Sequence, residues 1–89
     1  MQDEKIIQFK KAVGEIIREI RETKTDLSIT RLAYEYEFDK GNISKTERGL
    51  YNIQLATAWK ICEALGISFS DFAKLLEKKL GKDFTLIEE

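Results

Sequence analysis

Residues 30–49 contain the side chains whose types and spacing favour a binding chemistry. The segment reads as two short helices with a break near Phe38 and a stop at Gly49. Four polar or small positions of the second helix recur at steps of one and four residues and therefore share one face. They are Lys40, Gly41, Ser44 and Lys45. A short helix that presents cationic and hydrogen-bonding groups on one face suits insertion into the major groove of DNA.

The excess positive charge of the chain is concentrated in and just after the same region. The net charge of −1 counts against general attraction to DNA, because phosphate contacts dominate nucleic-acid affinity. Residues 40–60, however, hold four basic residues and one acidic residue, a balance of +3. Residues 1–39 and 61–89 each carry a balance of −2. The positive charge therefore lies where the candidate binding helix lies.

Composition excludes several other classes of protein. At 89 residues, with 43% apolar and 35% charged residues, the chain is expected to form one small globular domain. No apolar run approaches the roughly 20 residues that cross a bilayer, so no membrane partner is expected. A single cysteine and no secretory signal favour a reducing cytoplasm. The absence of histidine excludes His-based triads and metal clusters, and a single cysteine excludes thiolate clusters, so no catalysis, cofactor or metal is expected. No small-molecule effector is evident from the sequence.

The pattern of apolar residues predicts an all-α fold with five helices. The helices are expected over about residues 3–24, 28–36, 39–48, 55–65 and 68–81, with residues 82–89 as a tail that could be a short strand or a frayed end. Ser28, Asp39 and Ser68 are suitable N-cap residues. The helix over 28–36 and the helix over 39–48 would form a helix-turn-helix within a domain of residues 1–81.

Two helices carry specific expectations about packing. Gly14 interrupts the apolar stripe of the first helix, which costs about 1 kcal/mol unless a neighbouring backbone packs closely against it. The inward positions predicted for the fourth helix are Leu55, Ala58, Trp59, Cys62 and Leu65. Cys62 is then a small buried hydrophobic residue and not a reactive thiol.

The chain resembles the Cro/repressor-like (XRE) helix-turn-helix family of bacterial and phage transcription regulators. Four segments carry the resemblance in the order and spacing that the family shows. They are Val13-Gly14 with Ile17, Arg18 and Arg21; Leu27-Ser28 with Leu32-Ala33; Asn42 to Gly49; and Ala64 to Ile67 with Phe72. The resemblance implies a five-helix lambda-repressor-like DNA-binding domain, and covers roughly residues 13–72.

The resemblance also implies roles for individual residues. An arginine of the first helix, here Arg21, pairs in the family with a glutamate at the end of the reading helix, here Glu47. Base edges are read from the first residues of that helix, which correspond to Lys40, Gly41, Ser44 and Lys45. Phosphate contacts come from the start of the second helix, and other residues on and after the reading helix are further phosphate candidates. The corresponding residues are Ser28, Thr30, Arg31, Asn42, Thr46, Arg48, Tyr51 and Asn52.

Some positions depart from the family pattern. Ile29 replaces a residue that is often glutamine, and Thr46 occupies a position that is usually apolar. Glu35, Glu37 and Asp39 place acidic groups near the expected DNA-facing region, which weakens nonspecific affinity. The sequence therefore predicts modest binding by a single copy.

Members of the family usually bind inverted-repeat operators as dimers, so the implied partners are double-stranded DNA and a second copy of the chain. The apolar residues in excess of an obvious core mark a candidate dimer interface. They are Leu76, Leu80, Phe84, Leu86 and Ile87. The alternative is that these residues only seal one end of the domain. Two other functions stay open: an antirepressor or other protein-interaction module with the same fold, and the antitoxin of a toxin–antitoxin pair.

Overall fold

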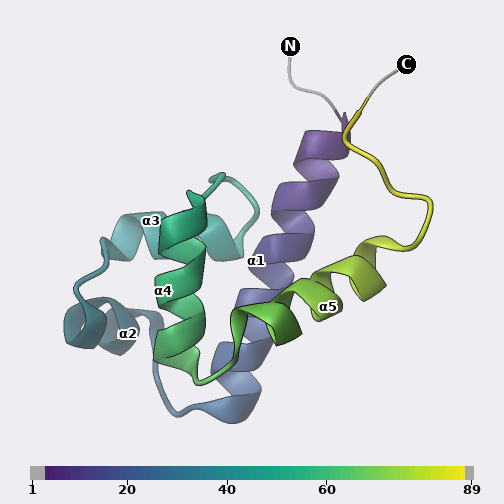
Figure 1. Cartoon of the computed structure of the whole chain (residues 1–89). Helices are drawn as coiled ribbons and strands as arrows, with labels where there is room; N and C mark the ends of the chain where they lie inside the picture. Colours follow the sequence, from purple (N-terminus) through teal and green to yellow (C-terminus); the bar gives the residue numbers. More distant parts are fainter. Residues whose placement is uncertain (1–3, 88–89) are drawn as a thin grey trace.

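The computed structural model describes residues 4–87 as five α-helices, with no strand in that range (Figure 1). The helices are α1 (Glu4–Lys24), α2 (Ile29–Tyr36), α3 (Lys40–Glu47), α4 (Leu55–Leu65) and α5 (Phe69–Leu80). This confirms the all-α prediction. Asp3, the expected start of the first helix, and the last two residues of the expected tail lie outside the described residues.

The predicted N-caps fix where three of the helices begin. Oxygen atoms of Ser28, Asp39 and Ser68 each accept a hydrogen bond from the backbone N–H three residues further on, at 3.1, 2.9 and 3.1 Å. These bonds satisfy N–H groups that a helix start otherwise leaves unpaired. The break between α2 and α3 is completed by Glu37, whose φ of 59° is left-handed although it is not a glycine.

One apolar core joins all five helices, and α1 runs through its middle. The most deeply buried aliphatic residues come from three different helices: Ile17 of α1, Leu32 of α2 and Ile61 of α4. Figure 1 shows α2 at one end of the molecule and the described start of α1 at the other. None of the helices in residues 4–87 is both long enough and apolar enough to cross a membrane.

The inward face of α4 differs from the predicted one. Ala58, Ile61, Cys62 and Leu65 are buried, whereas Leu55 and Trp59, both predicted to face inward, are 71% and 55% exposed. The buried set follows steps of three and four residues, and Trp59 lies one position outside it. Its indole ring instead stacks on the ring of Phe69, with centroids 5.4 Å apart, at the edge of the core.

The segment after α5 is neither a strand nor detached from the domain. Residues 82–87 turn back toward the beginning of α1, as the yellow segment of Figure 1 shows. The ring of Phe84 lies against that of Phe9, with centroids 6.3 Å apart. Leu76 and Leu80 are half-buried, while the chain leaves Leu86 and Ile87 exposed. Some of the apolar residues predicted to form a dimer interface therefore cover the junction of α1 and α5 instead.

Gly14 is the point where two backbones come closest. A Cβ atom at this position would overlap the carbonyl oxygens of Thr46 and Glu47, and would lie 2.8 Å from the latter. Gly49 makes a second close approach, because its Cβ would lie 2.8 Å from the Cα of Lys11. The φ of Gly49 is also +75°, which side chains rarely adopt. The last turn of α3 can therefore lie directly on the backbone of α1.

We predict that Gly14→Ala destabilises the protein although alanine is the better helix former. The methyl group must push α3 away from α1, so the free energy of unfolding should fall by about 1–3 kcal/mol. Urea unfolding followed by circular dichroism measures this change. Glu19→Ala, an exposed substitution in the same helix, should leave the stability within about 0.5 kcal/mol. Equal or greater stability of Gly14→Ala would contradict the close approach.

We predict that the thiol of Cys62 is unreactive in the folded protein. The side chain is 2% exposed, and burial raises the pKa of the thiol, so both access and thiolate are reduced. A thiol-specific reagent at pH 8 should modify it at least about 100-fold more slowly than in the unfolded chain, since local opening must come first. Rapid stoichiometric labelling without denaturant would show that this part of the core is open.

Candidate nucleic-acid interface

The outward face of α3 consists of the residues that the sequence singled out. Lys40, Gly41 and Lys45 are exposed and Ser44 is partly exposed. The opposite face is buried in the domain through Ile43, Thr46 and Glu47. Because the helix is anchored from behind, its polar face is presented to solvent by a rigid element.

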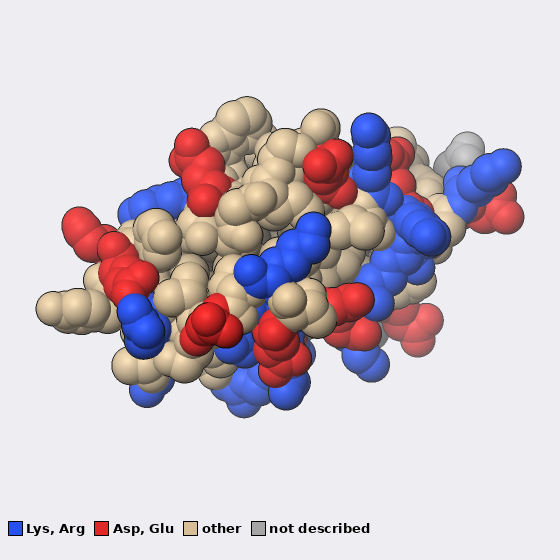
Figure 2. All heavy atoms as spheres, turned by 90° about the horizontal axis from the view of Figure 1, so that it is seen from below, with Lys and Arg blue, Asp and Glu red and all other residues tan. Residues whose placement is uncertain are grey.

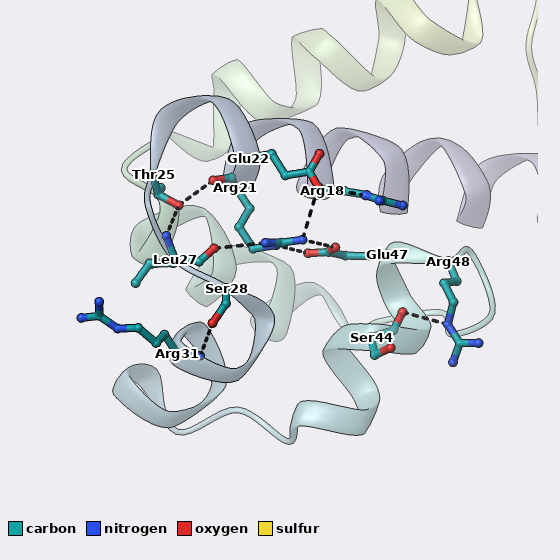
Figure 3. Close-up of polar contacts among 10 residues, drawn as sticks. All are labelled: Arg18, Arg21, Glu22, Thr25, Leu27, Ser28, Arg31, Ser44, Glu47 and Arg48. Atoms are coloured by element: carbon teal, nitrogen blue, oxygen red, sulfur yellow. Dashed lines mark hydrogen bonds and ion pairs between the residues drawn. The ribbon is translucent and has the colours of Figure 1, made fainter.

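The anchor of α3 is an ion pair between Arg21 of α1 and Glu47 (Figure 3). The guanidinium donates two hydrogen bonds, from Nε to Oε2 at 2.7 Å and from Nη2 to Oε1 at 2.9 Å. Its remaining Nη1 donates to the carbonyl oxygen of Leu27 at 3.1 Å. The hydrogen bonds to Glu47 raise the pKa of Arg21, which keeps the guanidinium charged. This is the ion pair that the family resemblance implied.

Burial decides what this pair contributes. Arg21 and Glu47 are 9% and 7% exposed, so both charges have lost much of their hydration. Forming such a pair gains little net stability, but removing one partner leaves a buried charge and typically costs about 3–5 kcal/mol. The planar, bidentate geometry also restricts rotation of α3 relative to α1. The pair therefore sets the orientation of the outward face.

Thr25, for which the sequence predicted no role, stabilises the backbone around Arg21. The Thr25 hydroxyl donates to the carbonyl oxygen of Arg21 at 2.6 Å and accepts from the backbone N–H of Leu27 at 3.1 Å. These two hydrogen bonds cap the end of α1 and order the linker to α2, in which the carbonyl of Leu27 accepts from Arg21. This role was predictable from the spacing, because a threonine hydroxyl can donate to the backbone carbonyl of the helical residue four positions earlier.

Most of the predicted phosphate contacts lie on the surface around α3. Seven of the eight are exposed: Ser28, Thr30, Arg31, Asn42, Arg48, Tyr51 and Asn52. They come from the start of α2, from α3 and its C-cap, and from the loop before α4. These residues therefore come from α3 and from the two segments that flank it along the chain.

Thr46 was wrongly predicted to contact phosphate. It is 1% exposed, and its hydroxyl donates to the backbone carbonyl of Asn42 at 2.7 Å. The close packing of α3 on Gly14 leaves this position no access to solvent. The hydroxyl satisfies itself within its own helix, so threonine can occupy a position that is usually apolar.

Arg31 is exposed, but it already has a partner. Its Nη2 donates to Oε1 of Glu35, one turn further along α2, at 2.6 Å. The hydrogen bond to Glu35 raises the pKa of Arg31, so the guanidinium is charged throughout the physiological range. In Figure 3 its side chain extends away from the Arg21 cluster to the outside of the domain.

On the face shown in Figure 2, the charges of the described residues do not form one large basic field. Figure 2 shows lysine and arginine interspersed with aspartate and glutamate over the face that it presents. The cations of α3 and its C-cap are Lys40, Lys45 and Arg48. Electrostatic attraction is therefore local and modest, in agreement with the net charge of −1.

Comparisons with known proteins agree with this architecture. A helix-turn-helix family model matches residues 17–72. The chain is 38% identical over 58 residues to the control protein C.BamHI of Bacillus amyloliquefaciens, which spans 65% of this chain and 72% of that protein. It is 33% identical over 66 residues to the control protein C.MunI of a Mycoplasma species, which spans 74% and 89%.

A solved structure shows the same fold. The restriction-modification controller protein C.Esp1396I, determined as a tetramer in complex with its natural 35-base-pair operator, superposes with a TM-score of 0.71. The match is 28% identical and covers 80% of this chain and 92% of that one. With its exposed α3, its buried Arg21–Glu47 pair and these matches, the chain belongs to the XRE-type helix-turn-helix family.

Proposed function

We propose that this protein is a sequence-specific, double-stranded DNA-binding transcription regulator that acts as a homodimer on an inverted-repeat operator. The observation that carries the proposal is the outward face of α3, with Lys40, Ser44 and Lys45 accessible while a buried ion pair fixes the helix from behind. Lysine can donate to guanine O6 and N7, serine to several bases, and Gly41 lets the helix approach closely. The groups around α3 would hold phosphates on both sides.

The relatives make the proposal more specific. Two of them are control proteins, and C.Esp1396I is a restriction-modification controller solved on its operator. We therefore propose a non-catalytic, cytoplasmic regulator of the controller type. The antirepressor and antitoxin alternatives would use the same fold, and the DNA-binding experiment below separates the antirepressor from the regulator.

A dimer that reads two half-sites restricts where its interface can lie. Half-sites read from one side of DNA are about 34 Å apart, so the contact between copies must lie between the two reading helices. The segment of residues 82–87, which contains the exposed Leu86 and Ile87, turns toward the start of α1, away from α2 (Figure 1). Leu50 lies in the loop after α3, Leu55 and Trp59 lie one turn apart on α4, and all three are exposed. We propose that this second apolar surface contacts the second copy.

We predict that the protein binds a palindromic duplex from its own promoter and that binding weakens steeply as salt rises. Lys40→Ala and Lys45→Ala should each reduce the preference for that duplex over an unrelated one by about tenfold, corresponding to about 1–3 kcal/mol per base contact. Arg48→Ala should weaken binding to both duplexes equally, because a phosphate contact reads no sequence. Fluorescence anisotropy over a salt series measures the affinity, the preference between the two duplexes and the salt dependence of binding.

The matched control is Lys74→Ala, which removes a lysine from the exposed surface of α5. It should leave both the affinity and the preference within about twofold of the wild type. Absence of duplex binding by the wild type at low salt would overturn the proposal that the protein is a DNA-binding regulator and would favour the protein-interaction module.

We predict that the proposed dimer interface can be followed through Trp59, the only tryptophan in the chain. The indole is 55% exposed in a single copy, so association should shift its emission to shorter wavelength as protein concentration rises. Leu55→Glu, a change at a 71%-exposed position, should abolish the shift and halve the mass seen by sedimentation. Ile87→Glu, at 73% exposure, should leave both unchanged. The reverse result would return the interface to the end of α5.

A further inference from the structure

The segment before the reading helix is unusually acidic for a DNA-facing surface. Within residues 25–39, Arg31 is the sole cation, and it is accompanied by four carboxylates. They are Asp26, Glu35, Glu37 and Asp39. Since α2 starts the helix-turn-helix, these groups lie near the DNA in the proposed complex, where carboxylates oppose phosphate binding.

Only one of these carboxylates neutralises the cation directly. Glu35 accepts from Arg31 at 2.6 Å, whereas Asp39 caps α3 through the N–H of Asn42. Asp39 thus has a structural reason to be there. Glu35 occurs in no cap and in no buried pair, and its side chain is 36% exposed. Its evident physical effects are to offset the positive charge of Arg31 and to orient that side chain.

A DNA phosphate would compete with Glu35 for the same guanidinium. Both ligands accept from the N–H groups of arginine in the same bidentate or single-bond geometries. We propose that Glu35 is an affinity-limiting residue, which holds Arg31 in an intrahelical pair and releases it only when a backbone phosphate takes its place. This inference rests on the proposed DNA-binding function and on Arg31 as one of its phosphate contacts.

The pair is well suited to such an exchange. The Arg31 side chain is 64% exposed and that of Glu35 is 36% exposed, and exposed ion pairs one helical turn apart are weak and sensitive to salt. Removal of Glu35 should therefore leave the fold intact. Every duplex, operator or not, would gain from the freed arginine, because a phosphate contact carries no sequence information. Glu35 thus lowers binding to all DNA, including the large excess of chromosomal sequence.

Glu35→Gln tests the proposal, because it removes the charge and keeps the shape of the side chain. We expect affinity for the promoter duplex and for an unrelated duplex to rise equally, by about two- to fivefold at 0.1 M salt. The slope of log K against log salt should become steeper by up to about 0.9, the value for one additional neutralised phosphate. In the Arg31→Gln background, Glu35→Gln should have no effect beyond that of the charge control.

The charge control is Glu77→Gln, an exposed position on α5, which changes the net charge equally without approaching α2. Affinity of Glu35→Gln at or below that of the wild type would overturn the proposal. An equal gain in the Arg31→Gln background would also overturn it, since the effect would then be repulsion and not competition. Failure of the wild type to bind any duplex would instead refute the proposed function itself.

Discussion

The close contact between the last turn of α3 and the backbone of α1 is the constraint on which the reading surface depends. Two features produce it, and they act differently. Gly14 removes the side chain that would keep the helices apart, so it sets the distance between them. The Arg21–Glu47 pair, with two hydrogen bonds in one plane, sets the rotation of α3 about its own axis. A helix fixed in distance and rotation presents the same side chains to every half-site.

This rigid presentation matters because general attraction to DNA is small. The cations around α3 are few, the net charge is −1, and the segment of residues 25–39 carries four carboxylates and one cation. Nonspecific affinity depends on the number of phosphates neutralised, whereas discrimination depends on well-placed base contacts. A regulator with few phosphate contacts gains selectivity from accurate positioning and from a second copy, which doubles both kinds of contact.

The parts of this arrangement that were predictable from sequence are those fixed by local chemistry. The caps at Ser28 and Asp39 depend on residues three positions apart, and the need for a backbone neighbour at Gly14 follows from helix propensity. The orientation of α4 was predicted incorrectly, since an apolar residue such as Trp59 fits two adjacent stripes and only tertiary contacts choose between them. The phosphate contact predicted for Thr46 was wrong for a related reason. Its hydroxyl can bind a phosphate only if it is exposed, but it is buried and donates to a backbone carbonyl of its own helix.

The residues that hold the fold and those that face outward hardly overlap. Ile43, Thr46 and Glu47 bury one side of α3, while Lys40 and Lys45 occupy the other and add nothing to the core. Outward residues can therefore change with little effect on stability, which allows one scaffold to serve many operators. Arg31 and Glu35 extend this separation to affinity, because an exposed pair can adjust the strength of DNA binding while the core stays unchanged.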